Sequence, residues 1–144
     1  MSSEPKQVII VRTHYVKPDG TVYKIRSGKQ ISQCAHASMA FLTQRIRKII
    51  SSNFQDNISW SNLIVSQAEL EWIVGPFAKI VVGVDSEEEL MEIHEKAIAA
   101  GLTVNLIEDS GRTEFAGVAT KTAIAIGPDY PEKIDPITGH LKLL

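Results

Sequence analysis

The sequence contains a single cysteine, Cys34, and no long apolar segment. One thiol cannot form a disulfide within the chain and cannot supply the ligands of a structural zinc site. The apolar runs are only as long as a β-strand, whereas a membrane-spanning helix needs about 20 residues, so we expect no membrane partner. The first residues, MSSEPKQ, also lack the apolar stretch of a secretory signal. These absences favour a soluble, cytoplasmic protein.

Several motifs of common enzymes are absent as well. The chain has no GxSxG, no Walker loop and no GxGxxG, which disfavours serine hydrolases, NTPases and dinucleotide-binding enzymes. It has no HExxH, and its four histidines are far apart, so their spacing predicts no metal site. Cys34 lies near the start of a predicted helix, beside its apolar stripe, and we favour a packed, inert thiol over a reactive one.

The charge is unevenly distributed along the chain, although the formal net charge is only −2. Residues 1–50 contain nine Lys and Arg against two Asp and Glu, so this part carries a net charge of +7, and the remainder carries −9. Such asymmetry favours an anionic partner, including nucleic acid. The alternative is that folding interleaves the two parts and neutralises the field.

The order of predicted elements indicates an α/β fold. Apolar, β-branched runs predict strands at 7–13, 78–84, 103–109 and 120–127, the last stopped by Gly127-Pro128. Helices are expected over 28–50, between the break at 51–57 and Gly75-Pro76, and from Ser86 to Gly101. We therefore expect one domain over 1–144, with a mixed, mostly parallel sheet of four to five strands and helices on both faces. Pro18-Asp19-Gly20 predicts an inserted hairpin at about 14–25, and the tail predicts one helical turn and a short extended end.

The helix expected over 28–50 has two distinct faces. Its apolar residues fall on one stripe, which we expect to pack on the sheet: Ile31, Ala35, Met39, Leu42, Ile46 and Ile49. Lys29, Gln33 and His36 share another stripe, nearly opposite Ile31 and Met39. Lys29 in the first turn, beside free backbone N–H groups, suits an anion or an oxyanion. The alternative is an ordinary solvated face. In the helical region expected after 51–57, Leu63, Ile64, Leu70 and Ile73 are candidate core residues, and Trp60 and Trp72 suit either core or interface.

A second polar segment follows the strand at 103–109. Asp109, Ser110 and Gly111 form a tight loop at the end of this strand, where ligands of α/β sheets bind. Asp109 could act as a general base or orient a lysine, and Arg112 and Thr113 could hold a phosphate or a sugar. The alternative is an ordinary Asx turn.

Four segments taken together resemble one family. They are KQVIIVRT (6–13), GKQISQCAHA (28–37), EDSGRTE (108–114) and AIAIGP…ITGHLKLL (123–144). They are similar to the archaeal and eukaryotic type of peptidyl-tRNA hydrolase, which differs in fold from the common bacterial type. The resemblance implies a compact α/β domain, usually a homodimer, that hydrolyses the ester between a peptide and the 3′ end of tRNA without a metal or other cofactor.

The resemblance also implies a site. Its motifs place catalytic residues at Lys29, Gln33, Asp109 and Thr122, and supporting residues at His36 and Arg112. We add Thr113, Arg26 and Arg47 as candidate contacts to substrate or tRNA, because cations meet phosphates. The general base stays open, since a carboxylate beside a lysine has a lowered pKa.

Two alternatives accompany this hypothesis. The chain departs from the family pattern at His14, at Ser27 and at the inserted hairpin, so the scaffold could be a non-catalytic module that binds tRNA or protein. The hairpin and the tryptophan region could also form an added partner or dimer surface while activity remains.

Overall fold

The structure, a computed structural model, describes residues 4–52, 63–112 and 114–144. A five-stranded sheet in the order β5-β6-β1-β4-β7 forms its centre. The strands are β1 (Lys6–Arg12), β4 (Lys79–Val84), β5 (Val104–Asp109), β6 (Thr120–Asp129) and β7 (Lys142–Leu143). The near-continuous apolar runs of β1 and β6 occupy central positions, as expected for strands that are covered on both faces.

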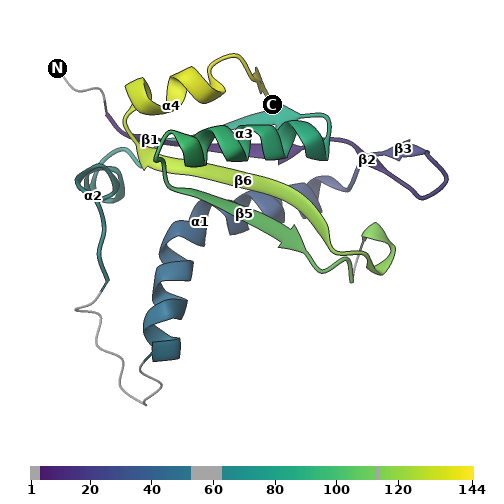
Figure 1. Ribbon diagram of the computed structural model, residues 1–144, viewed down its shortest axis with the longest axis horizontal. Coiled ribbons are helices and arrows are strands. Elements are labelled where there is room, and N and C mark those ends of the chain that lie inside the picture. The colour runs from purple at the N-terminus through teal and green to yellow at the C-terminus, as the bar shows by residue number, and fades with distance from the viewer. Residues whose placement is uncertain (1–3, 53–62, 113) are drawn as a thin grey trace.

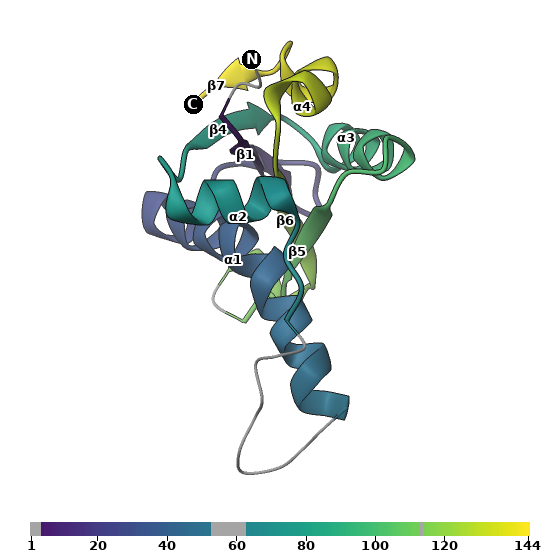
Figure 2. The same ribbon diagram turned by 90° about the vertical axis from the view of Figure 1, so that its left-hand side faces the viewer.

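Helices cover both faces of this sheet (Figures 1 and 2). The helices α1 (Ser27–Ser52) and α2 (Gln67–Val74) lie on one side, and α3 (Glu87–Ala99) and α4 (Pro131–Thr138) lie on the other. Ile10, Ile124 and Leu90 belong to the core under α3 and α4, whereas Val11 and Ala123 belong to the smaller core under α1. The predicted α/β fold with helices around a mixed sheet is confirmed.

The sheet is not mostly parallel, as the sequence analysis expected. Among the described strands of this sheet, only β1 and β4 pair in parallel, and the other three pairs, β1–β6, β5–β6 and β4–β7, are antiparallel. The expectation failed because β6 enters the sheet between β1 and β5 and runs against both. β6 also continues through Gly127-Pro128 to Asp129, where the sequence predicted a stop.

The buried face of α1 differs from the predicted one. Ile31 and Met39 are 68% and 61% exposed, so the first half of this apolar stripe faces away from the sheet, while Leu42, Ile46 and Ile49 are partly buried. The face that packs on the sheet instead contains Gln33, Ala37 and Ala40, each no more than 3% exposed. Small alanines let the helix approach the sheet closely. Hydrophobicity alone misassigned the faces because the helix buries a glutamine and leaves larger apolar groups outside.

The face of α2 was also misassigned. Ile64, Leu70 and Ile73 are 79%, 46% and 39% exposed, and the buried residues of the helix are Ala68, Glu69 and Trp72. Trp72 is a core residue, with its ring edge-on to Phe41 of α1 at 5.9 Å. Trp60 lies outside the described residues. A Ser66-Glu69 capping box, which the sequence analysis missed, fixes the start of this helix.

The turns and ends follow local chemistry more closely. Strands β2 (Tyr15–Val16) and β3 (Val22–Tyr23) form the predicted hairpin, and Gly20 at φ 89° donates its N–H to the Lys17 carbonyl. Gly101, at φ 75°, follows the end of α3 as predicted. The tail forms two turns of α4 rather than one, followed by β7.

Helix α1 begins at Ser27, and the Arg26 carbonyl accepts the N–H of Gln30. It therefore starts one residue before the predicted position. In the part of the chain that the structure describes, no helix is both long and apolar enough to cross a bilayer.

We predict that Ala37→Leu lowers the free energy of unfolding by about 1–3 kcal/mol, because overpacking a closed interface forces backbone shifts. Ala37 is 0% exposed between α1 and the sheet. Urea titration measures the loss. Ala35→Leu adds the same volume on the exposed side of α1 and should change stability by less than about 0.5 kcal/mol. Equal effects of both changes would contradict the assignment of the buried face.

Candidate active site

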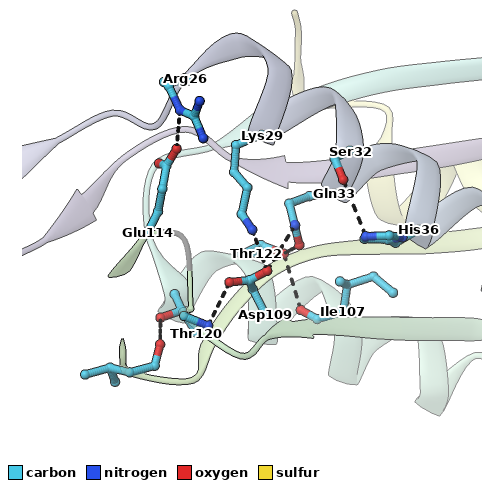
Figure 3. A network of polar contacts seen from close by, with 12 residues as sticks. Arg26, Lys29, Ser32, Gln33, His36, Ile107, Asp109, Glu114, Thr120 and Thr122 are labelled. Atoms are coloured by element: carbon cyan, nitrogen blue, oxygen red, sulfur yellow. Dashed lines mark hydrogen bonds and ion pairs between the residues drawn. The ribbon is translucent and has the colours of Figure 1, made fainter. Parts of the chain in front are cut away.

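Four polar side chains that are far apart in sequence meet beneath the first turns of α1 (Figure 3). Lys29 and Gln33 come from α1, Asp109 from the end of β5, and Thr122 from β6. Gln33 and Thr122 are 1% and 0% exposed, and the side chains of Lys29 and Asp109 are 14% and 13% exposed. The structure thus brings together the four predicted catalytic residues. The Lys29–Asp109 pair lies between the buried amide of Gln33 and solvent.

A β-bulge directs Thr122 into this cluster. Ile107 pairs with Ala123, but the next residue of β5, Glu108, pairs with Lys121. Thr122 is the extra residue, so its side chain and that of Ala123 both lie toward α1. Bulges re-aim side chains in this way beside active sites.

Hydrogen bonds join the four residues in one chain. The Thr122 hydroxyl donates to Gln33 Oε1 at 2.6 Å, and Gln33 Nε2 donates to Asp109 Oδ1 at 3.4 Å. Lys29 Nζ donates to the same Oδ1 at 2.7 Å. Because the amide oxygen of Gln33 is held by Thr122, its NH2 group is directed at the carboxylate.

The backbone supplies a third donor to Asp109. The N–H of Gly111 reaches Asp109 Oδ2 at 2.8 Å. Gly111 has φ 81°, and a Cβ there would lie 2.4 Å from the Val118 carbonyl oxygen, so the position admits only glycine. This bond is the Asx turn that the sequence offered as the alternative for the loop, and it is present together with the Lys29 bond.

These donors determine the ionisation of Asp109. Partial burial opposes the charged carboxylate, but hydrogen bonds from Lys29, Gly111 and Gln33, with the charge of Lys29, outweigh it and hold the pKa of Asp109 below its usual value. Asp109 is therefore charged at neutral pH and poorly suited to accept a proton.

The remaining predicted residues lie around this cluster. Arg26 Nε donates to Glu114 Oε1 at 2.7 Å, so a bond closes the rim between the start of α1 and the loop after Asp109. His36 and Arg47 line one cavity of about 390 Å³ between α1 and β5. Arg112 is exposed and takes part in none of these contacts. Thr113 lies outside the described residues.

Folding partly neutralises the charge asymmetry. Within the described residues, ion pairs join at least five of the nine basic side chains of residues 1–50 to acids beyond residue 50: Lys6–Asp135, Arg12–Glu87, Arg26–Glu114, Lys29–Asp109 and Arg45–Glu69. The interleaving alternative thus accounts for much of the basic half.

Other chemistry finds less support in the geometry. Among the described residues, no group of three or more His, Cys, Asp or Glu side chains is placed to hold a metal ion. Cys34 is half-buried against the core under α1, and burial raises the pKa of its thiol, in agreement with the packed thiol that the sequence favoured.

The geometry defines an α/β protein with a lysine–aspartate pair and an oriented amide at one end of a mixed sheet. The model of the family described as "Peptidyl-tRNA hydrolase PTH2" matches residues 5–144. The chain therefore belongs to the PTH2 family of peptidyl-tRNA hydrolases.

Individual relatives agree with this assignment. A peptidyl-tRNA hydrolase of Methanocaldococcus jannaschii is 51% identical over 74 residues, which cover 51% of this chain and 64% of the relative. The mouse mitochondrial peptidyl-tRNA hydrolase 2 is 33% identical over 99% of this chain and 65% of its own length. For the enzyme of Methanothermobacter thermautotrophicus the identity is 34%, over 96% of this chain and 99% of the relative. The chain thus spans slightly less than two thirds of the first two relatives and nearly all of the third.

A solved structure shares the fold. It is a protein of unknown function from Agrobacterium, with a TM-score of 0.54 and 18% identity over 99% of this chain and 98% of that one. At this identity the likeness concerns the fold alone.

We predict that the free energy of unfolding falls at low pH because Asp109 becomes protonated. Because the pKa of Asp109 is lowered from 3.8 in the folded state, its contribution is fully present above about pH 4 and is lost as pH falls through the folded pKa. At pH 7, Asp109→Asn should cost about 1.5–3 kcal/mol, the contribution of hydrogen bonds to a charged group. Urea titrations from pH 7 to 2.5 should show that the difference in free energy of unfolding between wild type and Asp109→Asn shrinks as the pH falls.

Glu92→Gln, which changes an exposed residue of α3, is the control, and its difference from wild type in free energy of unfolding should be small at every pH. A difference in free energy of unfolding between wild type and Asp109→Asn that stays constant down to pH 2.5 would contradict the conclusion that Asp109 is charged and hydrogen-bonded.

Proposed function

We propose that this chain hydrolyses the ester bond between a peptide and the 3′ end of tRNA, and so recycles tRNA from peptidyl-tRNA. The single observation that carries the proposal is the bonded set of Lys29, Gln33, Asp109 and Thr122. Membership of the PTH2 family supports the same activity. In the reaction, water adds to the ester carbonyl, the bond to the ribose oxygen breaks, and that oxygen takes up a proton.

Lys29 is the group that we assign to the developing negative charge. Its ammonium lies in the first turn of α1, where backbone N–H groups are free of helical partners. A tetrahedral intermediate carries its charge on the former carbonyl oxygen, and pre-positioned donors of this kind stabilise it. The helix N-terminus adds a favourable field of the same sign.

Asp109 is better suited to positioning than to proton abstraction. Its two oxygens already accept three hydrogen bonds, and its lowered pKa makes it a weak base. We therefore propose that Asp109 holds the Lys29 ammonium in place. The proton of the attacking water then passes to a group other than this carboxylate.

Gln33 and Thr122 act as a pair in this proposal. Thr122 fixes the amide of Gln33, so the NH2 group stays directed at the charged pair and cannot rotate to present its oxygen. Because Gln33 is only 1% exposed, its part in the proposed reaction is to hold Asp109, which in turn holds the Lys29 ammonium.

Contacts to tRNA are proposed along α1. His36 and Arg47 share a cavity beside the site, and Arg26 and Arg112 are exposed at its rim. Cations in this arrangement meet backbone phosphates, and such binding weakens steeply as salt rises. A non-catalytic binding module is the less favoured alternative. It gives no role to the bonded set of Lys29, Gln33, Asp109 and Thr122.

We predict that Lys29→Ala lowers kcat by about 100- to 1,000-fold, which is typical for loss of one oxyanion donor. Release of an N-acetyl-aminoacyl group from tRNA measures turnover. Circular dichroism should show that the variant is folded. Lys96→Ala removes an exposed lysine of α3 and is the matched control, with activity close to that of wild type.

We propose further that turnover requires no metal ion. Activity that survives a chelator and vanishes in Lys29→Ala would support both parts of the proposal. Full activity in Lys29→Ala would refute the assigned site. Wild-type protein that is folded but inactive on every substrate would refute the hydrolase itself and favour the binding module.

We also propose that the chain acts as a homodimer in the cytoplasm, where its substrate arises during translation. Exposed apolar residues at helical spacing on and just after α2 support a dimer face: Leu70, Ile73, Val74 and Phe77 are 46%, 39%, 76% and 49% exposed. We call these four residues the α2 patch.

Sedimentation should give about twice the chain mass of 15.9 kDa for wild type. Val74→Glu introduces a charge into the α2 patch and should give a monomer, because an unpaired charge in an apolar interface is costly. Ile98→Glu changes a residue of α3 that is 56% exposed and should leave the dimer intact. A wild-type monomer at all concentrations would rule out the dimer.

A further inference from the structure

A groove of about 910 Å³ lies between the β2–β3 hairpin, the start of α3 and the segment 114–120. These three elements meet at the same end of the molecule as the first turn of α1 (Figure 1). The size falls within the range of sites that hold small molecules or short peptide segments. Nothing in the catalytic cluster described above makes use of it.

The floor of the groove is aromatic and apolar. Tyr15 packs against Phe115 with ring centroids 4.7 Å apart and against Tyr23 at 5.9 Å. Val16 and Val118 line the same groove and are each 61% exposed. Apolar side chains that stay exposed inside a groove offer contact area to a ligand with apolar parts.

The groove shares a wall with the catalytic cluster. Thr120 lines the groove and is the ladder partner of Asp109. Val118 also lines it, and its backbone lies against Gly111, which donates to Asp109. Glu114 lines it and bonds Arg26 at the rim of the site. A ligand that fills the groove therefore lies next to the residues that hold Asp109 and Arg26.

The charge of the groove disfavours nucleic acid. Its lining contains four carboxylates, Asp85, Glu87, Glu88 and Glu114, against the two cations Arg12 and Lys17. Arg12 pairs with Glu87 at 3.9 Å, and Glu114 is bonded to Arg26. Asp85 and Glu88 then remain against Lys17, so the lining stays acidic by a smaller margin. Carboxylates repel phosphates and attract cations. The substrate consists of a polyanion and a peptide, and only the peptide suits this lining.

We propose that the groove binds the peptide part of the substrate and favours cationic and aromatic side chains close to the ester. The inference rests on the proposed hydrolase function and extends it, because it assigns the two parts of the substrate to separate surfaces. The tRNA lies along α1, and the peptide leaves the ester toward the hairpin. The inserted hairpin then has a role, since Tyr15, Val16 and Tyr23 form one side of the groove.

The test compares substrates that share one tRNA and differ only in the peptide. N-acetylated tripeptides carry either two lysines or two glutamates before the same C-terminal residue. For wild type, kcat/KM should be about fivefold higher for the lysine peptide, because exposed opposite charges contribute up to about 1 kcal/mol. In Glu88→Gln the ratio should fall toward one. Glu92→Gln, one turn further along α3, is the matched control and should keep the wild-type ratio.

Outcomes of this test separate the two proposals. Turnover with equal rates for both peptides, or a ratio that persists in Glu88→Gln, overturns the peptide groove and leaves the hydrolase standing. If no substrate is turned over, including N-acetyl-aminoacyl-tRNA, the result overturns both the hydrolase proposal and the proposed role of the groove. A free lysine-rich tripeptide amide that binds wild type, without any preference between the two substrates, indicates a docking groove for a protein segment and also overturns the proposal.

Discussion

The buried amide of Gln33 is the constraint on which the site depends. An amide without partners in a closed interface would cost several kcal/mol, so both of its ends must be bound. Thr122 binds the oxygen, and the nitrogen reaches Asp109, which in turn holds Lys29. The requirement to satisfy one polar group thus fixes a threonine from the sheet, an aspartate from a strand end and a lysine from the helix start.

This constraint explains where sequence reasoning succeeded and where it failed. The elements along the chain and the grouping of Lys29, Gln33, Asp109 and Thr122 could be predicted, because strand periodicity and family motifs are local signals. The buried face of α1 could not, because the helix buries Gln33 among alanines and leaves Ile31 and Met39 exposed, against the hydrophobic pattern. The directions of the strands could not be predicted from the sequence either, because they depend on the insertion of β6 between β1 and β5. The Thr122 bulge depends on backbone geometry that no motif records, whereas the Gly111 donor belongs to the Asx turn that the sequence offered as an alternative.

Charge in this protein has two separate uses. Several cations of the first 50 residues are bonded to acids of the remainder. These ion pairs join β1 to α4, the start of α1 to β5 and the loop after it, and α1 to α2. Glu69 has two roles: it caps α2, and it binds Arg45 of α1 through both carboxylate oxygens. The charges left at the surface then divide the molecule into a cationic side along α1 and an acidic groove beside the hairpin.

The extra residue in β6 also decides which cation reaches Asp109. With the register that joins Ile107 to Ala123 continued unbroken, the residue opposite Asp109 would be Lys121, and its ammonium would compete with Lys29 for the carboxylate. The bulge shifts the pairing by one position, so that uncharged Thr120 stands there instead. A single inserted residue therefore gives the aspartate one defined counterion and leaves the register of the hydrophobic core unchanged.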